Sequence, residues 1–213
     1  MKTEALIERL SERAAPVEAR AGLRVLALGT AAGVAASLAL MWLWLGIRPD
    51  LAAAMGTSAY WMKFFYTLVL ALAGFWTVER LARPGASSRA QMILEALPFA
   101  AIAALALMRL AEAPAEARMG LVMGSSSQLC PWRIVLLALP ICAGALWGLR
   151  RLAPTRPVIA GAAAGLLAGA AGAFVYAFHC DESAAPFVAV WYSVGIAVVG
   201  LLGAAAGRLV LRW

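Results

Sequence analysis

The sequence predicts an all-α, polytopic integral membrane protein with six transmembrane helices and both termini in the cytoplasm. Three observations support this fold class: the composition, the number of long apolar segments, and the distribution of arginine and lysine. Hydrophobic residues make up 64% of the 213 residues and charged residues 14%, whereas soluble proteins average about 45–50% and about 25%. A water-soluble domain of this size could not bury so much apolar surface, so the expected solvent is the lipid bilayer.

Six segments are long and apolar enough to be spans, because a helix needs roughly 20 apolar residues to cross about 30 Å of hydrocarbon. The third is the weakest, since its apolar run is short and Glu95 lies in its first turn. We therefore expect a cytoplasmic N-terminal segment at residues 1–23 and a six-helix transmembrane domain at residues 24–213. The expected spans are Val25–Ile47, Tyr60–Leu81, Ile93–Met108, Ile134–Leu149, Val158–Phe178 and Phe187–Leu211.

The basic residues predict the orientation. With the N-terminus inside, thirteen of the 18 arginine and lysine residues fall in inner segments and the other five in outer ones, and an excess of basic residues marks the cytoplasmic side of a membrane protein. The acidic residues divide almost evenly between the two sides. The net charge of +7 is therefore a signal of topology, and we expect no direct contact with nucleic acid. The predicted location is the bacterial inner membrane.

The predicted spans carry almost no charge. Lys63, Glu95 and Arg109 lie near span ends, from where their side chains are expected to reach the membrane interface. Transporters usually place ionisable groups at mid-depth, so ion-coupled transport is disfavoured. A neutral passive pore is kept as an alternative. Glycines at helical spacing predict close packing between helices. They are Gly29 and Gly33; Gly161, Gly165 and Gly169; and Gly203 and Gly207.

Polar chemistry gathers on the predicted outer face. Cys130 precedes the fourth span, and the run His179-Cys180-Asp181-Glu182 follows the fifth. These spans are antiparallel neighbours joined by a short inner turn, so their outer ends should lie together. Three interpretations stay open for Cys130 and Cys180: a structural disulfide, a reactive or metal-binding pair, and two unrelated cysteines. Cys142 lies inside the fourth span and is expected to be inert.

Soft metal ions are one expected ligand of this region. Thiolate, imidazole and carboxylate together suit zinc, cadmium or copper, and Cys130, Cys180, His179 and Asp181 are the candidate ligands. We expect no permanent cofactor, only a metal ion bound transiently by the outer cysteines.

An enzyme is not expected. The chain has no C-x-x-C motif, which argues against a thiol oxidoreductase. An intramembrane serine protease is a further alternative, since Gly124-Ser125-Ser126-Ser127 and His179 superficially fit a Ser–His dyad. The serines precede the fourth span, however, instead of lying within it.

The sequence predicts a short amphipathic helix at residues 3–15 of the N-terminal segment. Leu6, Ile7 and Leu10 fall on one stripe, surrounded by glutamate and arginine, and Pro16 ends the helix. The mixed charges fit a helix docking into a protein groove better than a helix on the lipid surface, which would favour lysine and arginine.

The assembled motifs resemble the NrsF-like family of bacterial membrane anti-sigma factors, the negative regulators of sigma F. The matching pieces occur in order along nearly the whole chain: LIERLSERAAPVEAR, WMKFFYTLVLALAG, RLARPG, CPWRI with LALP, APTRPVIAGAAAGLLAGAAGAFVYAFHC, FVAVWYSVGI and the final LRW.

The resemblance implies an inner-membrane protein that holds an extracytoplasmic-function sigma factor inactive at its cytoplasmic side. It associates the two outer cysteines with sensing, here Cys130 and Cys180, and the expected stimulus is an oxidant or a heavy metal. The family does not identify the residues that bind the sigma factor. From the amphipathic stripe we expect contacts from Leu6, Ile7, Leu10 and Val17. A redox-active or metal-binding membrane protein without a sigma partner is the alternative.

Overall fold

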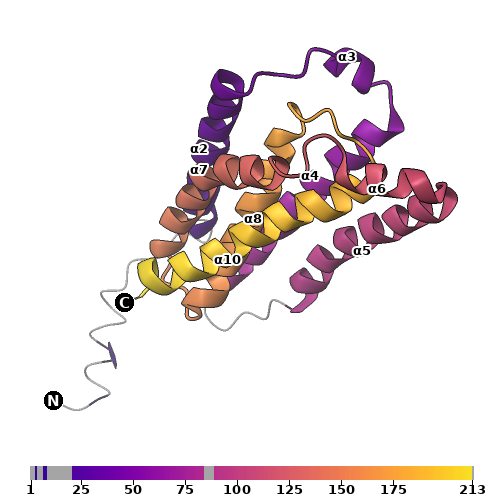
Figure 1. Ribbon diagram of the computed structural model, residues 1–213. Coiled ribbons are helices and arrows are strands. Elements are labelled where there is room, and N and C mark those ends of the chain that lie inside the picture. The colour runs from indigo at the N-terminus through magenta and orange to yellow at the C-terminus, as the bar shows by residue number, and fades with distance from the viewer. Residues whose placement is uncertain (1–2, 4–6, 9–20, 84–88, 213) are drawn as a thin grey trace.

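The computed structural model describes residues 3, 7–8, 21–83 and 89–212, and every regular element in these ranges is a helix (Figure 1). Six helical stretches are long and apolar enough to cross a membrane, as predicted. The bounds of these stretches are Ala21–Trp44 (α2), Ser58–Leu81 (α4), Ile93–Glu112 within α5 (Arg89–Glu112), Cys130–Arg150 (α7), Pro157–Tyr176 (α8) and Ala185–Val210. Because α5 begins at Arg89, Glu95 lies in its second turn and not in the first.

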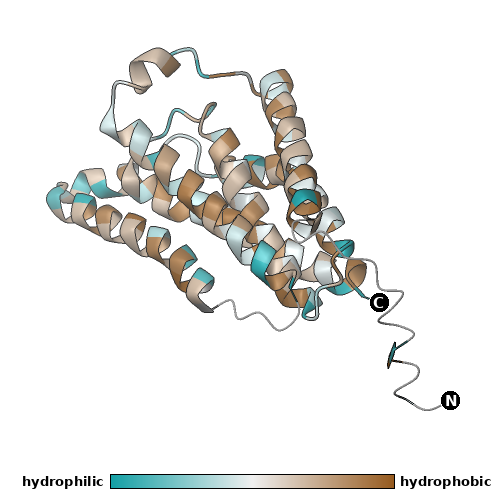
Figure 2. Ribbon diagram, turned by 180° about the vertical axis from the view of Figure 1, so that it is seen from behind, coloured by the Kyte–Doolittle hydropathy of each residue, from teal (hydrophilic) through white to brown (hydrophobic). Residues whose placement is uncertain are grey.

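The central helix is α8. In the apolar stretch of α8, 72% of the residues are buried, whereas 11% are buried in the apolar stretch of α5 at the edge of the bundle. It packs against α10 (Ser193–Val210), α4 and α7, while α2 packs on α7. Alanine and glycine dominate its sequence, so neighbouring backbones can approach closely. Many large apolar side chains on the helices are exposed, and hydrophobic residues recur along the long helices (Figure 2).

The predicted glycine contacts are confirmed. Gly161 on α8 faces Gly203 on α10, and a Cβ atom added to either glycine would overlap the carbonyl oxygen of the other. On the other side of the bundle, Gly29 of α2 meets Gly144 of α7 in the same way. These contacts hold the helices at a separation that only a residue without a side chain permits.

The last span is not one uniform helix. It begins with α9 (Ala185–Phe187), continues as a π-helix at Val188–Tyr192 (η1) and becomes regular only in α10. Single π-helical turns occur frequently near functional sites. Here the π-helix buries Tyr192 completely and lets the Trp191 indole nitrogen donate to the carbonyl oxygen of Val122 at 2.8 Å.

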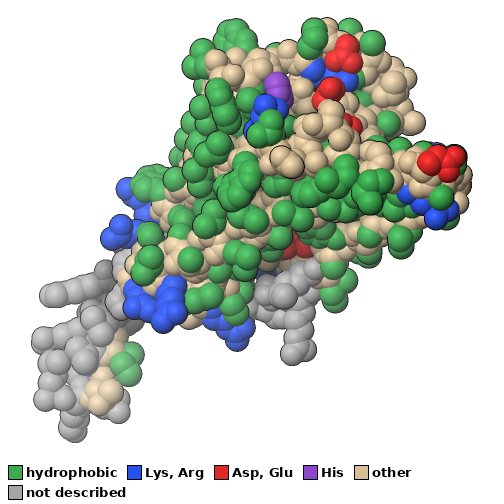
Figure 3. All heavy atoms as spheres, viewed as in Figure 1, with side chains coloured by type: hydrophobic (Ala, Val, Ile, Leu, Met, Phe, Trp, Pro, Cys, Tyr) green, Lys and Arg blue, Asp and Glu red, His purple; other side chains and the backbone are tan. Residues whose placement is uncertain are grey.

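The two ends of the bundle differ in charge. The arginine end, where α2 begins and α10 ends, carries exposed basic side chains (Figure 3). The cysteine end is the opposite one, where α7 begins and α8 ends. It holds two connections with short helices of their own, α3 (Leu51–Ala54) and α6 (Ala115–Met123). The exposed residues of the arginine end are Arg24, Arg80, Arg83, Arg150, Arg151, Arg156, Arg208 and Arg212.

Candidate functional site

The structure brings the two predicted sensing cysteines together at the cysteine end. Cys130 is the first residue of α7, and Cys180 lies in the connection that follows α8. Both are free thiols and both are buried, with 0% and 2% exposure. The Cys130 and Cys180 side chains are neighbours, and each affects the ionisation of the other. The expectation that the ends of these two helices meet is therefore confirmed, while Cys142 is buried farther along α7.

Local sequence fixes both cysteines. Cys130 donates its backbone N–H to the Ser126 carbonyl at 2.9 Å, and the following Pro131 suits a first helical turn because it has no N–H to satisfy there. At the end of α8, the backbone N–H groups of His179 and Cys180 both donate to the Tyr176 carbonyl at 2.9 Å. These bonds close the helix and turn the next residues back toward the bundle.

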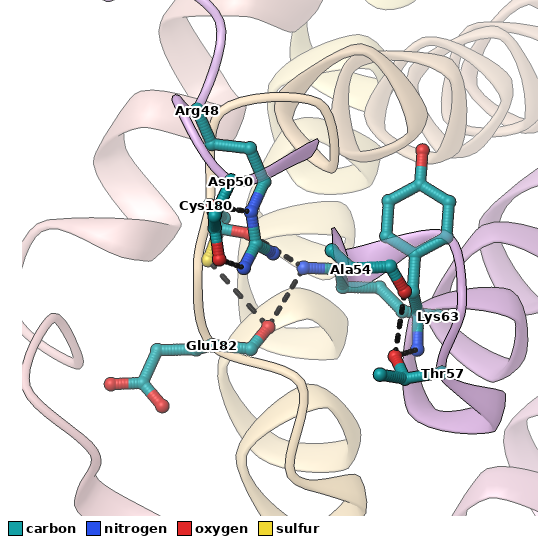
Figure 4. A network of polar contacts seen from close by, with 8 residues as sticks. Arg48, Asp50, Ala54, Thr57, Lys63, Cys180 and Glu182 are labelled. Atoms are coloured by element: carbon teal, nitrogen blue, oxygen red, sulfur yellow. Dashed lines mark hydrogen bonds and ion pairs between the residues drawn. The ribbon is translucent and has the colours of Figure 1, made fainter. Parts of the chain in front are cut away.

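Lys63, which was expected to reach the membrane interface, points into the protein instead. Its side chain is completely buried in the first turns of α4. The Nζ atom donates to the carbonyl oxygens of Cys180 and Glu182, at 2.8 Å each (Figure 4). The expectation was wrong because the connection after α8 offers carbonyl groups that no helix satisfies. The ammonium donates to two of them and stays inside the protein.

Arg48 is a second buried cation at the same carbonyl. Its Nη1 donates to the Cys180 oxygen at 3.1 Å, and its other nitrogens donate to both Asp50 carboxylate oxygens at 2.7 Å. The Arg48 backbone N–H also donates to the Phe178 carbonyl at 3.1 Å. The hydrogen bonds from Arg48 hold the pKa of the Asp50 carboxyl below its usual value. The connection between α2 and α4 is thereby fixed to the one after α8 (Figure 4).

Glu182 fixes the far side of the connection after α8. Its Oε1 accepts from the Ser125 backbone N–H at 2.6 Å and from the Ser125 hydroxyl at 2.8 Å. Gly124 makes this approach possible, because its φ of +53° and its missing side chain leave room for the carboxylate. The connection carrying Cys180 is therefore held by α4 on one side and by the segment before α7 on the other.

The Ser–His dyad of the serine-protease alternative is not formed between Ser125 and His179. The Ser125 hydroxyl pairs with Glu182. In the part of the chain that the structure describes, the ring of His179 bonds Gly46 and Arg133: Nδ1 is 2.9 Å from the Gly46 carbonyl oxygen, and Nε2 is 3.3 Å from Arg133 Nη1. A neutral imidazole with its proton on Nδ1 satisfies both contacts.

The four candidate metal ligands do not converge on one point. Cys130 and Cys180 adjoin, but both ring nitrogens of His179 are engaged elsewhere and Asp181 is exposed. Among the residues described, no group of three or more His, Cys, Asp or Glu side chains is arranged to hold a metal ion. Metal binding by the two sulfurs stays a prediction.

The surroundings of Cys180 favour its thiolate. The hydrogen bond from the Cys130 thiol and the positive charge of Lys63 lower the pKa of the Cys180 thiol to about 6, although burial acts in the opposite direction. A thiolate is the nucleophilic form of cysteine. A thiolate in contact with a second thiol is suited to oxidation to a disulfide.

Sequence reasoning found the cysteines but missed the groups that hold them: Lys63, Arg48, and Ser125 as the partner of Glu182. The available signal was Lys63 itself, because a charged residue within an apolar segment is a candidate functional residue by default.

Comparison with known proteins identifies the family of this chain. The family model described as "Negative regulator of sigma F" (NrsF) matches residues 10–213. The chain is 42% identical over 214 residues to the anti-sigma-F factor NrsF of Caulobacter vibrioides, covering 100% of both chains. It is 39% identical over 213 residues to the probable anti-sigma-F factor NrsF of Azospira oryzae, again covering 100% of both. No solved structure matches the chain significantly. The chain therefore belongs to the NrsF family, the negative regulators of sigma F.

Proposed function

We propose that this protein is an inner-membrane anti-sigma factor that holds an extracytoplasmic-function sigma factor at its cytoplasmic face and releases it when Cys130 and Cys180 are oxidised. Membership of the NrsF family and the names of two full-length relatives support the anti-sigma role. The observation that carries the sensing half is the contact between two free, buried thiols at the junction of α7 and α8.

The charge distribution supports the orientation. The arginine end faces the cytoplasm in this proposal, because basic residues concentrate on that side of membrane proteins. The chain enters α2 and leaves α10 at this end (Figure 1). The cysteine end then faces the periplasm, which is oxidising in Gram-negative bacteria.

The sigma factor binds the N-terminal segment in this proposal. Leu6, Leu10 and Val17, three of the four predicted contacts, lie outside the described residues. The fourth, Ile7, is helical and its side chain is 61% exposed. An exposed apolar side chain is what an amphipathic helix uses when it docks into a groove of its partner.

The chemical step is the oxidation of two thiols to one disulfide, with a hydroperoxide as the oxidant. The Cys180 thiolate attacks the terminal peroxide oxygen, the O–O bond breaks, and an alkoxide leaves and takes up a proton. The resulting sulfenic acid is attacked by the Cys130 sulfur, which forms the S–S bond and releases water. A soft metal bridging the two sulfurs is the alternative stimulus, without electron transfer.

Rigid helix packing links the two faces. A change at the start of α7 or the end of α8 moves helices that meet α2 and α10 through backbone contacts at glycine. Such coupling needs two discrete arrangements that both sites bias. A tenfold loss of sigma affinity corresponds to only about 1.4 kcal/mol.

The test is a pull-down of the tagged protein from gently solubilised native membranes, with and without peroxide treatment. The matched samples are the full chain, a variant lacking residues 1–20, and Cys130→Ser combined with Cys180→Ser. We expect the full chain to retain a sigma factor and lose it on oxidation, the truncated chain to retain none, and the double variant to retain it under both conditions. Release from the double variant under peroxide would contradict cysteine sensing. Absence of a sigma factor from the full chain would contradict the anti-sigma role.

A further inference from the structure

Lys63 is a buried charge without a carboxylate partner. Its ammonium is 0% exposed, and burying an unpaired charge is costly. Among the described residues no carboxylate lies within ion-pair distance of it. The Asp50 carboxylate is occupied by Arg48, and the Glu182 carboxylate is turned away toward Ser125. The ammonium is held by two carbonyl oxygens and lies over the Tyr192 ring, 5.9 Å from its centroid, so a nearby anion would stabilise it further.

The Cys180 sulfur is placed to supply that charge. Lys63 Nζ and Cys180 Sγ both lie against the carbonyl oxygen of Glu182, at 2.8 Å and 3.9 Å (Figure 4). Lys63 Nζ also holds the carbonyl of Cys180 itself. The same side chain therefore fixes the backbone on which the sulfur is carried and brings a positive charge close to it.

We propose that Lys63 is a positioning residue for the thiol pair, one that holds Cys180 as the attacking thiolate and leaves Cys130 as the second thiol. The inference rests on the proposed sensing role of the same site. It concerns which sulfur reacts first and how stable the reduced pair is, and neither property follows from the presence of two cysteines.

Other ionisable groups also surround Cys180, and they do not replace Lys63. Arg48 reaches the Cys180 carbonyl but is neutralised by Asp50. Arg133 faces His179 from α7. The remaining ionisable neighbours are neither lysine nor arginine: Cys130 on α7, Tyr176 on α8, Tyr192 on η1, and His179, Asp181 and Glu182 in the connection itself. Among the described cations, Lys63 is the one that shares the Glu182 carbonyl oxygen with the Cys180 sulfur.

Loss of the Lys63 charge should have opposite effects on the rate at which the disulfide forms and on the stability of the disulfide once formed. With glutathione disulfide as the oxidant, the Cys180 thiolate attacks one sulfur of the glutathione disulfide and one glutathione leaves. The Cys130 thiol loses its proton and its sulfur attacks Cys180, so the second glutathione leaves and the S–S bond is complete. A cation that stabilises the thiolate stabilises the reduced state and raises the reduction potential of the pair. Removal of the charge should slow the first attack and also make the finished disulfide more stable.

The experiment uses the purified full-length protein in detergent, equilibrated with glutathione buffers of graded ratio. Disulfide content is measured by mass spectrometry after acid quenching. The neutral variant is Lys63→Gln, which keeps hydrogen-bond donors for the two carbonyls, and the charge-conserving variant is Lys63→Arg. The matched control is Thr67→Val, because Thr67 is equally buried one turn along α4 and its hydroxyl bonds carbonyls of its own helix.

We expect Lys63→Gln to shift the equilibrium about tenfold toward the disulfide, a fall of about 30 mV for this two-electron couple. We also expect it to slow glutathione attachment to Cys180 about threefold, measured at about pH 5 in the Cys130→Ser background, because a roughly tenfold loss of thiolate is partly offset by the greater nucleophilicity of the more basic thiolate. Lys63→Arg and Thr67→Val should stay close to the unmodified protein in both measurements. If Lys63→Gln does not yield a monodisperse protein, Lys63→Met is measured in its place.

Three results would overturn the inference: an unchanged potential in the neutral variant, an equal shift in Lys63→Arg, or first attachment of glutathione at Cys130. The measurement contains no sigma factor, so it separates this inference from the proposed function. If the reduction potential of the thiol pair shifts as expected but sigma release does not depend on the cysteines, the proposed sensing function is rejected and the role of Lys63 is kept.

Discussion

Helix α8 and the connection that follows it are held in place by different forces. Between α8 and α10, Gly161 and Gly203 let two backbones touch, and stability depends on how closely the helices fit together. In residues 179–184, carbonyl and carboxylate oxygens are held by Lys63, Arg48 and Ser125, and stability depends on charge and direction. A chemical change at a thiol alters the local charge and the directions of the nearby hydrogen bonds, but it does not alter the shape of the helices. The first region therefore suits transmission and the second suits detection.

The largest effect is expected where shape alone holds the structure. Gly161→Leu places a side chain against the backbone of α10, which cannot give way, so the loss should reach or exceed the upper end of the about 1–3 kcal/mol typical of overpacking. The fraction of folded, monodisperse protein and its thermal midpoint measure it. The matched control is Ala162→Leu, which faces a groove of about 280 Å³ beside α5. Equal losses in the two variants would show that the close contact is unimportant.

A smaller effect is expected at the entry to α7. Gly124→Ala forces a side chain into a conformation that is nearly exclusive to glycine, where a new Cβ would lie 2.6 Å from the Glu182 carboxylate oxygen. The expected cost is about 1–3 kcal/mol, with faster hydrogen exchange at the Ser125 amide. Gly120→Ala, at an open position of the neighbouring α6, should be neutral or slightly stabilising. Unaltered exchange at Ser125 in Gly124→Ala would argue against the hydrogen bonds that Ser125 donates to the Glu182 carboxylate.

The reactivity of Cys180 should depend on pH in a defined window. Its pKa is lowered to about 6 from 9.0, so alkylation should rise through about pH 6 and level off well below pH 9. Because the folded value is the lower one, the stabilisation is present above the unfolded pKa and is lost as the pH falls through about 6. Cys130→Ala removes the hydrogen-bond donor and should move the midpoint upward by about one pH unit, which lowers the thiolate fraction at neutral pH from about nine-tenths to about one half. A midpoint near 9 in the unmodified protein would contradict the thiolate assignment.

The smallest effect is expected for the contact between η1 and α6. Trp191→Phe keeps the apolar ring and removes the hydrogen bond to the Val122 carbonyl, at a cost of about 0.5–1.5 kcal/mol. Thermal unfolding of the purified protein measures the change. Trp132→Phe is the control, because Trp132 is 65% exposed. A control variant as destabilised as Trp191→Phe would mean that the lost bond contributes nothing.

Much of the fold could be predicted from the sequence, because the signals involved are local. An apolar run of sufficient length specifies a span wherever it occurs, and proline and glycine specify where it ends. The short turn between α7 and α8 makes the two helices antiparallel neighbours, which is enough to bring Cys130 and Cys180 to the same end. The N-terminal sigma-binding segment was also predicted from a local pattern, and it stays a prediction.

The groups that control the thiols depended on the tertiary structure. Lys63 bonds a carbonyl 117 positions away, and Arg48 bonds the same carbonyl across 132 positions. A lysine near the end of a span reads the same in the sequence whether its side chain reaches the lipid interface or the protein interior. The choice depends on which unsatisfied carbonyl groups the packed helices bring within reach. The sequence by itself determined the helices and the pair of cysteines, because those follow from hydropathy and chain connectivity. Only the packed structure decided which charges face the sulfurs, because a buried charge takes its position from partners supplied by distant parts of the chain.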